Sequence, residues 1–148
     1  CEKQLNFATL DLYPILQTLE ILAWDPKTII QSVQIFIHLY GQSPRSTDKD
    51  SIYNSLSSIF RWWSPQTLAT CDERLAALKK FYNSQPDLFS DILTQQLDTS
   101  PQIGMYNCRP MFSPLPYKDG ESIQHLYNHR YQICEFLLSV KRLFLGLR

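Results

Sequence analysis

Two of the three histidines, His125 and His129, have the spacing best suited to metal chemistry. They lie four positions apart, so a helix would place both imidazoles on one face. A third ligand such as Cys108 or Glu121 would complete a set of the kind that binds zinc. However, the glutamate of the HExxH pattern is missing, and no further ligand has a recognisable spacing. We therefore expect a solvated pair of surface histidines, and keep a small metal-dependent enzyme as an alternative.

The cysteines are widely and irregularly spaced, and no CxxC pair indicates a zinc site or a redox motif. They are Cys1, Cys71, Cys108 and Cys134. Cys71 and Cys134 fall on apolar helix faces, where we expect core residues rather than nucleophiles. The leading interpretation is buried free thiols in a cytoplasmic protein. The alternative is a secreted or lipid-anchored helical bundle in which the cysteines pair.

Motifs for nucleotide binding or hydrolysis are missing from the sequence. It contains no GxxxxGK, GxGxxG or GxSxG, and its four glycines offer little material for a phosphate-binding loop. The neighbouring carboxylates of Asp72 and Glu73 begin a predicted helix, where capping and the helix dipole explain them. We therefore expect a protein that is not an enzyme and has no cofactor.

One aromatic and basic cluster is a candidate for partner binding. Arg61, Trp62 and Trp63 can form a stacking surface for a base or a peptide at the end of a helix. Adjacent tryptophans can equally wedge between packed helices. The basic pairs at 79–80 and 141–142 are too few for a nucleic-acid footprint, so the expected partner is a protein.

A second candidate lies in residues 98–119, which hold four of the nine prolines and still carry many apolar side chains. An unstructured linker would be more polar. Long loops without secondary structure are usually functional or disordered, and this one has enough apolar side chains to pack on the helices. Its candidate contacts with a partner are Tyr106, Arg109 and Phe112.

The composition is that of a chain with a substantial core and no net charge. Of its 148 residues, 44% are hydrophobic and 13% aromatic, which suits one domain with large buried side chains. Fourteen basic residues balance fourteen acidic ones, so no global field attracts nucleic acid or an anionic membrane. No apolar run approaches the roughly 18 to 20 residues of a membrane span. We expect a single cytoplasmic domain over residues 1–148.

Helical periodicity recurs along the chain, whereas the alternation typical of strands is scarce. Apolar stripes predict an antiparallel hairpin whose second helix is capped by Asp25 and has Pro26 at its first position. The first helix is expected to begin near Pro14, and the second to end at Gly41. The polar and turn-rich residues 42–51 predict an exposed loop.

Further helices complete the pattern. A third is predicted from Ile52, a fourth from the capping box of Thr70 and Glu73, and a fifth from Pro86. The last is expected over 119–145, and its second half is apolar on more than one face. That excess predicts burial against something beyond a single hairpin partner.

The fold class that follows is all-α. Short links force neighbouring helices to be antiparallel, and helical hairpins laid side by side form α-solenoids. We predict a helical-repeat-like array of about five to six helices with one long proline-rich loop. No strict period of about 34 or 40 residues is visible, and a compact bundle can use the same elements.

Three stretches carry a family pattern: LEILAWDPKTII (19–30), the region from YNSLSSIFRWW to ILTQQL (53–97), and NCRPMFSP (107–114). In this order they resemble a helical region of large bacterial multidomain proteins, many of them similar to antiphage-defence NTPases of the STAND type. Ser64 stands where that pattern has Leu, and Met111-Phe112 stand where it has a basic and an aromatic residue.

The resemblance implies that the chain is a C-terminal-side part of a much longer protein, whose ATPase, sirtuin-like or nuclease domain lies elsewhere. Helical arrays of this kind bind a trigger or hold the assembly inactive until it is triggered. The function predicted for this chain is therefore a non-catalytic scaffold or sensor that binds a protein partner or other domains of the parent protein.

Overall fold

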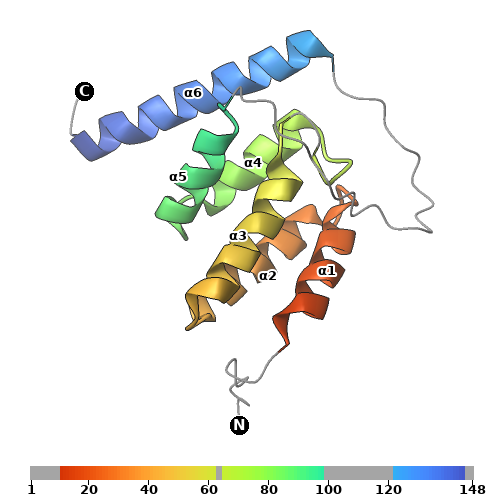
Figure 1. The fold of residues 1–148 in the computed structure, drawn as a ribbon. Coiled ribbons are helices and arrows are strands. Elements are labelled where there is room, and N and C mark those ends of the chain that lie inside the picture. Colours follow the sequence, from red (N-terminus) through yellow and green to blue (C-terminus); the bar gives the residue numbers. More distant parts are fainter. Residues whose placement is uncertain (1–10, 63–64, 99–121, 146–148) are drawn as a thin grey trace.

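A computed structural model of the chain describes residues 11–62, 65–98 and 122–145. These residues form six α-helices and no strand (Figure 1). In chain order the helices are α1 (Leu12–Ala23), α2 (Ile29–Gln42), α3 (Ser46–Phe60), α4 (Cys71–Phe81), α5 (Pro86–Gln95) and α6 (Ile123–Leu145). The all-α prediction is confirmed, and the arrangement of the helices is compatible with a helical-repeat array.

The first three helices pack against one another as a unit, referred to below as the α1–α3 unit. Their apolar stripes meet in a core that also receives side chains from α4 and α5. Side chains with no exposed surface in the α1–α3 unit are Ala23, Val33, Phe36, Ile52, Leu56, Ile59 and Phe60. Burial of these apolar groups is the main source of stability in this part of the molecule.

The corner between α1 and α2 differs from its prediction. Asp25 Oδ1 accepts a hydrogen bond from the Lys27 amide at 2.9 Å, and α2 begins only at Ile29. The Ile29 amide in turn donates to the Asp25 carbonyl at 3.1 Å. Pro26 therefore lies in a turn before the helix rather than at the first helical position, because the Asp25 side chain stabilises an Asx-type turn.

The corner is also held from a distant part of the chain. The Leu68 amide donates to the Trp24 carbonyl at 2.9 Å, which ties the segment before α4 to the end of α1. Trp24 itself is buried. The WDP sequence therefore marks a packed junction as well as a change of direction.

α3 begins at Ser46 rather than at Ile52, so the predicted loop over 42–51 was wrong for most of its length. Arg45 Nε donates to Asp48 Oδ2 at 2.9 Å, and Asp48 lies in the first turn of the helix. A carboxylate in this position interacts favourably with the helix dipole. The first turns of α3 are polar because most of their side chains face solvent, so hydrophobic periodicity does not detect them.

Two other boundaries shift by a few residues. α1 begins at Leu12, where Asp11 Oδ1 accepts a hydrogen bond from the Tyr13 amide at 3.2 Å. Pro14 is tolerated in this first turn because its missing N–H has no partner to lose there. α2 continues past Gly41 to Gln42, a difference within the usual uncertainty of helix ends.

The predicted starts of α4 and α5 are confirmed. The Glu73 amide donates to Thr70 Oγ1 at 3.2 Å, and Glu73 Oε2 accepts from the Thr70 amide at 2.7 Å, which together make the capping box. Pro86 is the first residue of α5. The buried side of α5 consists of Leu88, Phe89, Ile92 and Leu93.

α6 lies across the top of the other helices in the view of Figure 1, where it contacts α4 and α5. It begins at Ile123 rather than near Asp119, with Ser122 Oγ accepting a hydrogen bond from the His125 amide at 3.2 Å. In the part of the chain that the structure describes, no helix combines the length and the apolar character needed to cross a bilayer.

Candidate partner-binding groove

The predicted Arg61–Trp62 corner directly follows α3. Trp62 Nε1 donates to the Asp98 carbonyl at 3.2 Å, and the Arg130 guanidinium lies 5.2 Å from the centroid of a Trp62 ring. Arg130 also donates to the Leu97 carbonyl at 2.6 Å. Trp62 thus connects the ends of α3 and α5 to α6, as an interhelical wedge would.

The other predicted contacts with a partner lie outside the described residues. These are Trp63, Tyr106, Arg109 and Phe112. The proline-rich segment 98–119 also lies outside, apart from Asp98. A binding role for these residues stays a prediction, and Arg61 and Trp62 are the two predicted contacts that the structure places.

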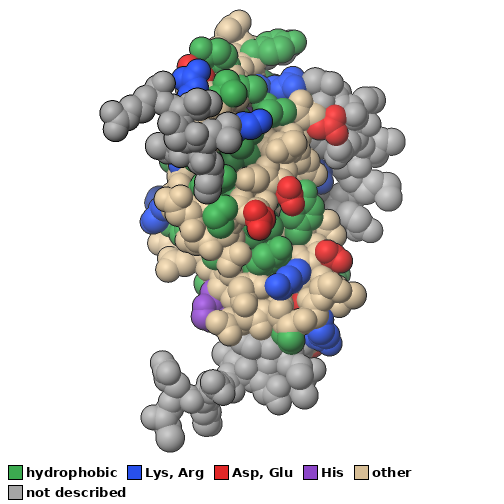
Figure 2. All heavy atoms as spheres, turned by 90° about the vertical axis from the view of Figure 1, so that its left-hand side faces the viewer, with side chains coloured by type: hydrophobic (Ala, Val, Ile, Leu, Met, Phe, Trp, Pro, Cys, Tyr) green, Lys and Arg blue, Asp and Glu red, His purple; other side chains and the backbone are tan. Residues whose placement is uncertain are grey.

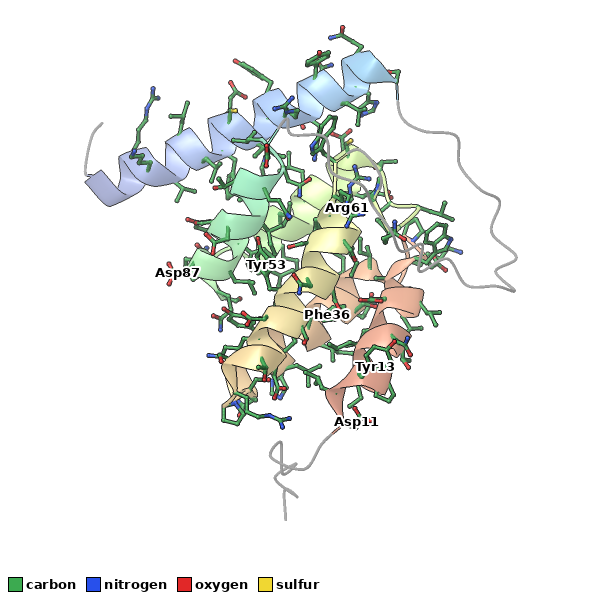
Figure 3. The ribbon with its side chains drawn as sticks, viewed as in Figure 1. Asp11, Tyr13, Phe36, Tyr53, Arg61 and Asp87 are labelled. Atoms are coloured by element: carbon green, nitrogen blue, oxygen red, sulfur yellow. The ribbon has the colours of Figure 1, made fainter. Side chains whose placement is uncertain are left out.

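Arg61 forms part of the wall of a groove between α1 and α3, whose volume is about 600 Å³. The lining side chains come from three helices and from the residue after α3: Tyr13, Leu16, Gln17 and Glu20 on α1, Ser51, Asn54, Ser55, Ser57 and Ser58 on α3, Gln95 on α5, and Arg61. Figure 3 shows Tyr13 on α1 and Arg61 at the far end of α3. Below, this feature is called the α1–α3 groove.

The groove exists because α3 presents small side chains to α1. Ser51, Ser55 and Ser58 follow one another at spacings of four and three residues, which places them on one helical face. Larger side chains at these positions would interdigitate with α1 and close the space, as in an ordinary helix contact. Serines along one face of α3 therefore open a channel beside the buried core.

Hydrogen bonding in the groove is only partly satisfied within the described residues. The Ser51 and Ser58 hydroxyls donate to backbone carbonyls of α3, at 2.9 and 2.8 Å. In contrast, Ser57 Oγ and Gln95 Oε1 are buried and have no hydrogen-bond partner in the described part of the chain. Most buried polar atoms of folded proteins have a partner, so these two are chemically unusual.

This groove was not predicted from the sequence. A usable signal was present in the spacing of Ser51, Ser55 and Ser58, but assignment of 42–51 to a loop separated Ser51 from the helix. The opposing wall is even less visible in sequence, since Tyr13 and Gln17 are ordinary exposed residues of α1. Their side chains bond to each other, with Gln17 Nε2 donating to Tyr13 Oη at 2.8 Å.

The two described cysteines have different surroundings. Cys71 is buried at the start of α4, as predicted for a core residue. Cys134 is exposed, so its prediction as a core residue was wrong. Its neighbour Ile133 occupies the buried face of α6 instead. Cys71 Sγ accepts a hydrogen bond from Arg74 Nη2 at 3.2 Å, and Cys1 and Cys108 lie outside the described residues.

The two histidines of α6 also differ in exposure. His125 is exposed as expected, whereas His129 is buried, and both line a small pocket with Asp72 of α4. Among the described residues, no group of three or more His, Cys, Asp or Glu side chains is placed to bind a metal ion. The other candidate ligands, Cys108 and Glu121, lie outside these residues, so the metal alternative stays a prediction.

Comparison with known proteins matches no family model, no curated protein and no solved structure. The chemistry of the α1–α3 groove therefore follows from its own side chains. Its described lining offers hydroxyl, amide, carboxylate and guanidinium groups but no histidine, lysine or cysteine. Such a surface is suited to hydrogen bonding with a partner.

Proposed function

We propose that the chain is a non-catalytic helical scaffold or sensor domain that binds a protein partner in the α1–α3 groove. The observation that carries this proposal is the open channel between α1 and α3, whose lining includes hydroxyl and amide side chains. Packed helices normally leave no such space between them. Hydroxyls and side-chain amides can both donate and accept hydrogen bonds. They therefore suit the alternating N–H and C=O groups of a peptide main chain.

The exposed amide groups of the lining favour a peptide with free backbone groups, because Gln17 and Asn54 each carry a donor and an acceptor. A volume of about 600 Å³ is also within the range of pockets that enclose small ligands, about 300 to 1,000 Å³. An extended segment of a partner protein meets both requirements.

The family resemblance supports a biological setting for this binding. We propose a cytoplasmic parent protein of the bacterial defence type, in which this chain senses a phage-derived trigger or contacts another domain. Catalysis would belong to that other domain. Trp63, Tyr106, Arg109 and Phe112, together with Arg61 and Trp62, are proposed to add contacts with the partner.

The test is to fill the groove without disturbing the core. Asn54 is exposed and lines the groove, so Asn54→Trp adds bulk where a partner would lie. Gln34→Trp is the matched control, because Gln34 is exposed on α2 and is not part of the lining. Circular dichroism should show equal helix content for both variants.

Binding of candidate phage proteins to the parent chain is then measured by calorimetry, together with signalling in cells. Asn54→Trp should weaken binding at least tenfold, equivalent to about 1.4 kcal/mol, whereas Gln34→Trp should not. Arg109→Ala and Phe112→Ala test the additional contacts in the same assay. Unchanged affinity and signalling in Asn54→Trp would remove the groove from the mechanism.

A further inference from the structure

α6 presents an apolar stripe to solvent. Tyr127, Tyr131 and Leu138 are 62%, 65% and 56% exposed, and Cys134 is exposed between them. Figure 2 shows hydrophobic side chains at the upper end of the molecule, where α6 lies. The four residues follow one another at spacings of four, three and four, so they share one face of the helix. They are called the α6 stripe below.

We propose that the α6 stripe is the surface through which two copies of this chain pair, with their α6 helices antiparallel. The alternation of four and three residues is the spacing of the a and d positions of a heptad. Side chains with this spacing insert between the side chains of another helix. The geometry thus favours a helical partner, and this proposal does not depend on the function of the α1–α3 groove.

The α6 stripe of one copy can pack against the same stripe of a second copy that runs in the opposite direction. A two-fold axis midway between Tyr131 and Cys134 sets each Tyr131 opposite the Cys134 of the second copy. The same axis sets Tyr127 opposite Leu138. Each such pair of facing residues forms one layer of the interface and combines an aromatic ring with a smaller side chain. Because of the two-fold axis each kind of layer occurs twice, as in an isologous interface.

The charges of α6 favour the antiparallel arrangement over the parallel one. A parallel pair would bring the basic residues Lys141 and Arg142 of both copies to the same end, whereas the antiparallel pair separates them. A parallel pair would also need Arg130 to reach Glu135 of the second copy across the seam. The Arg130 guanidinium is instead held by the Leu97 carbonyl and the Trp62 ring.

The flanks of the seam fit the same arrangement. Asn128 and Glu135 lie seven residues apart on one side of the α6 stripe, so the antiparallel pair brings the amide of each copy near the carboxylate of the other. Glu135 also accepts a hydrogen bond from Tyr131, and this bond and its charge raise the pKa of Tyr131 above the ordinary value.

The size of the α6 stripe predicts a reversible dimer. The eleven steps from Tyr127 to Leu138 cover about 16 Å of helix, at a rise of about 1.5 Å per residue. An interface based on four layers is smaller than the roughly 1,200 to 2,000 Å² of stable complexes. We therefore expect association that depends on concentration.

Sedimentation equilibrium of the 148-residue chain tests the proposal. Tyr131→Glu and Leu138→Glu should each raise the dissociation constant of the dimer at least tenfold. Both side chains are largely exposed, so the fold should persist, as circular dichroism will show. Ile35→Glu is the matched control, because Ile35 is 45% exposed on α2, and it should leave the constant unchanged.

Crosslinking tests the orientation. In a chain carrying Cys1→Ser and Cys108→Ser, a short bismaleimide should join the two Cys134 thiols across the axis, since Cys71 is buried. Adding Cys134→Ser should abolish the product. A chain that is monomeric at every concentration, or a dimer that tolerates both glutamate substitutions, overturns the proposal and assigns the α6 stripe to another partner.

Discussion

The α1–α3 unit and α6 are both built from amphipathic helices, but they are held in different ways. In the unit, each helix contributes several buried apolar side chains to one core, among them Val33, Phe36 and Ile52. In α6, Ile133 is the one fully buried apolar side chain among those described. The helix is otherwise held by partly buried side chains and by individual contacts such as that of Arg130 with the Leu97 carbonyl.

The α1–α3 unit is stabilised mainly by burial of apolar surface, whereas α6 is held in position by individual contacts. Burial of apolar surface is non-directional and yields about 25 cal/mol per Å², so the unit draws stability from many contacts at once. The contacts of α6 are few and directional. They include the edge-to-face pair of Tyr82 and Phe136, whose ring centroids are 5.4 Å apart. They fix the position of α6 while its outer face stays exposed, and α6 should therefore open before the α1–α3 unit unfolds.

The largest expected effect is that of Phe36→Ala. Phe36 has no exposed surface and lies within the α1–α3 unit, as labelled in Figure 3. Removal of its ring leaves a cavity and should lower the free energy of unfolding by about 3 to 5 kcal/mol. Denaturant titration followed by far-ultraviolet circular dichroism measures this loss. A loss below about 1 kcal/mol would contradict the assignment of the main core to this unit.

A smaller and more local effect is expected for Ile133→Ala. Removal of a buried Ile side chain costs about 2 to 5 kcal/mol, and α6 should lie at the lower end because the helix can shift on its contacts. Hydrogen exchange should show faster exchange in α6 amides and little change in α1 and α2. Equal loss of protection in α2 and α6 would instead indicate that the two regions unfold as one cooperative unit.

The smallest effect is expected for Arg130→Ala. It removes the hydrogen bond to the Leu97 carbonyl and the stacking on Trp62, together worth about 1 to 2 kcal/mol at a partly exposed site. The fluorescence of Trp62 should change, because its ring loses the guanidinium. Arg142→Ala is the control, since Arg142 is exposed on the same helix. Identical denaturation midpoints for both variants would show that Arg130 does not hold α6.

The parts of the fold that were predictable have local causes. The capping box of Thr70 and Glu73 and the proline at the start of α5 act within a single helical turn, so the sequence alone indicates them. The start of α3 escaped prediction because its polar first turns bury little apolar surface. Pro26 shows the limit of a local rule, since the same residue type suits both a turn and a first helical position.

The candidate site was much less predictable than the helices. Arg61 and Trp62 were identified by residue type, but their neighbours come from distant segments. Trp62 bonds to Asp98, which lies 36 positions away, and Arg130 stacks on its ring. The α1–α3 groove depends on which face of α3 meets α1, and no periodicity specifies that choice.

The sequence by itself determined an all-helical chain, most of its helix positions and the absence of net charge, because helix caps and apolar periodicity act over a few residues. Only the tertiary structure decided that His129 is buried and Cys134 exposed, and that serines of α3 open a groove beside α1. Both choices depend on how faces from distant segments meet. The free energy of packing these faces together depends on the shape and burial of side chains across the whole molecule.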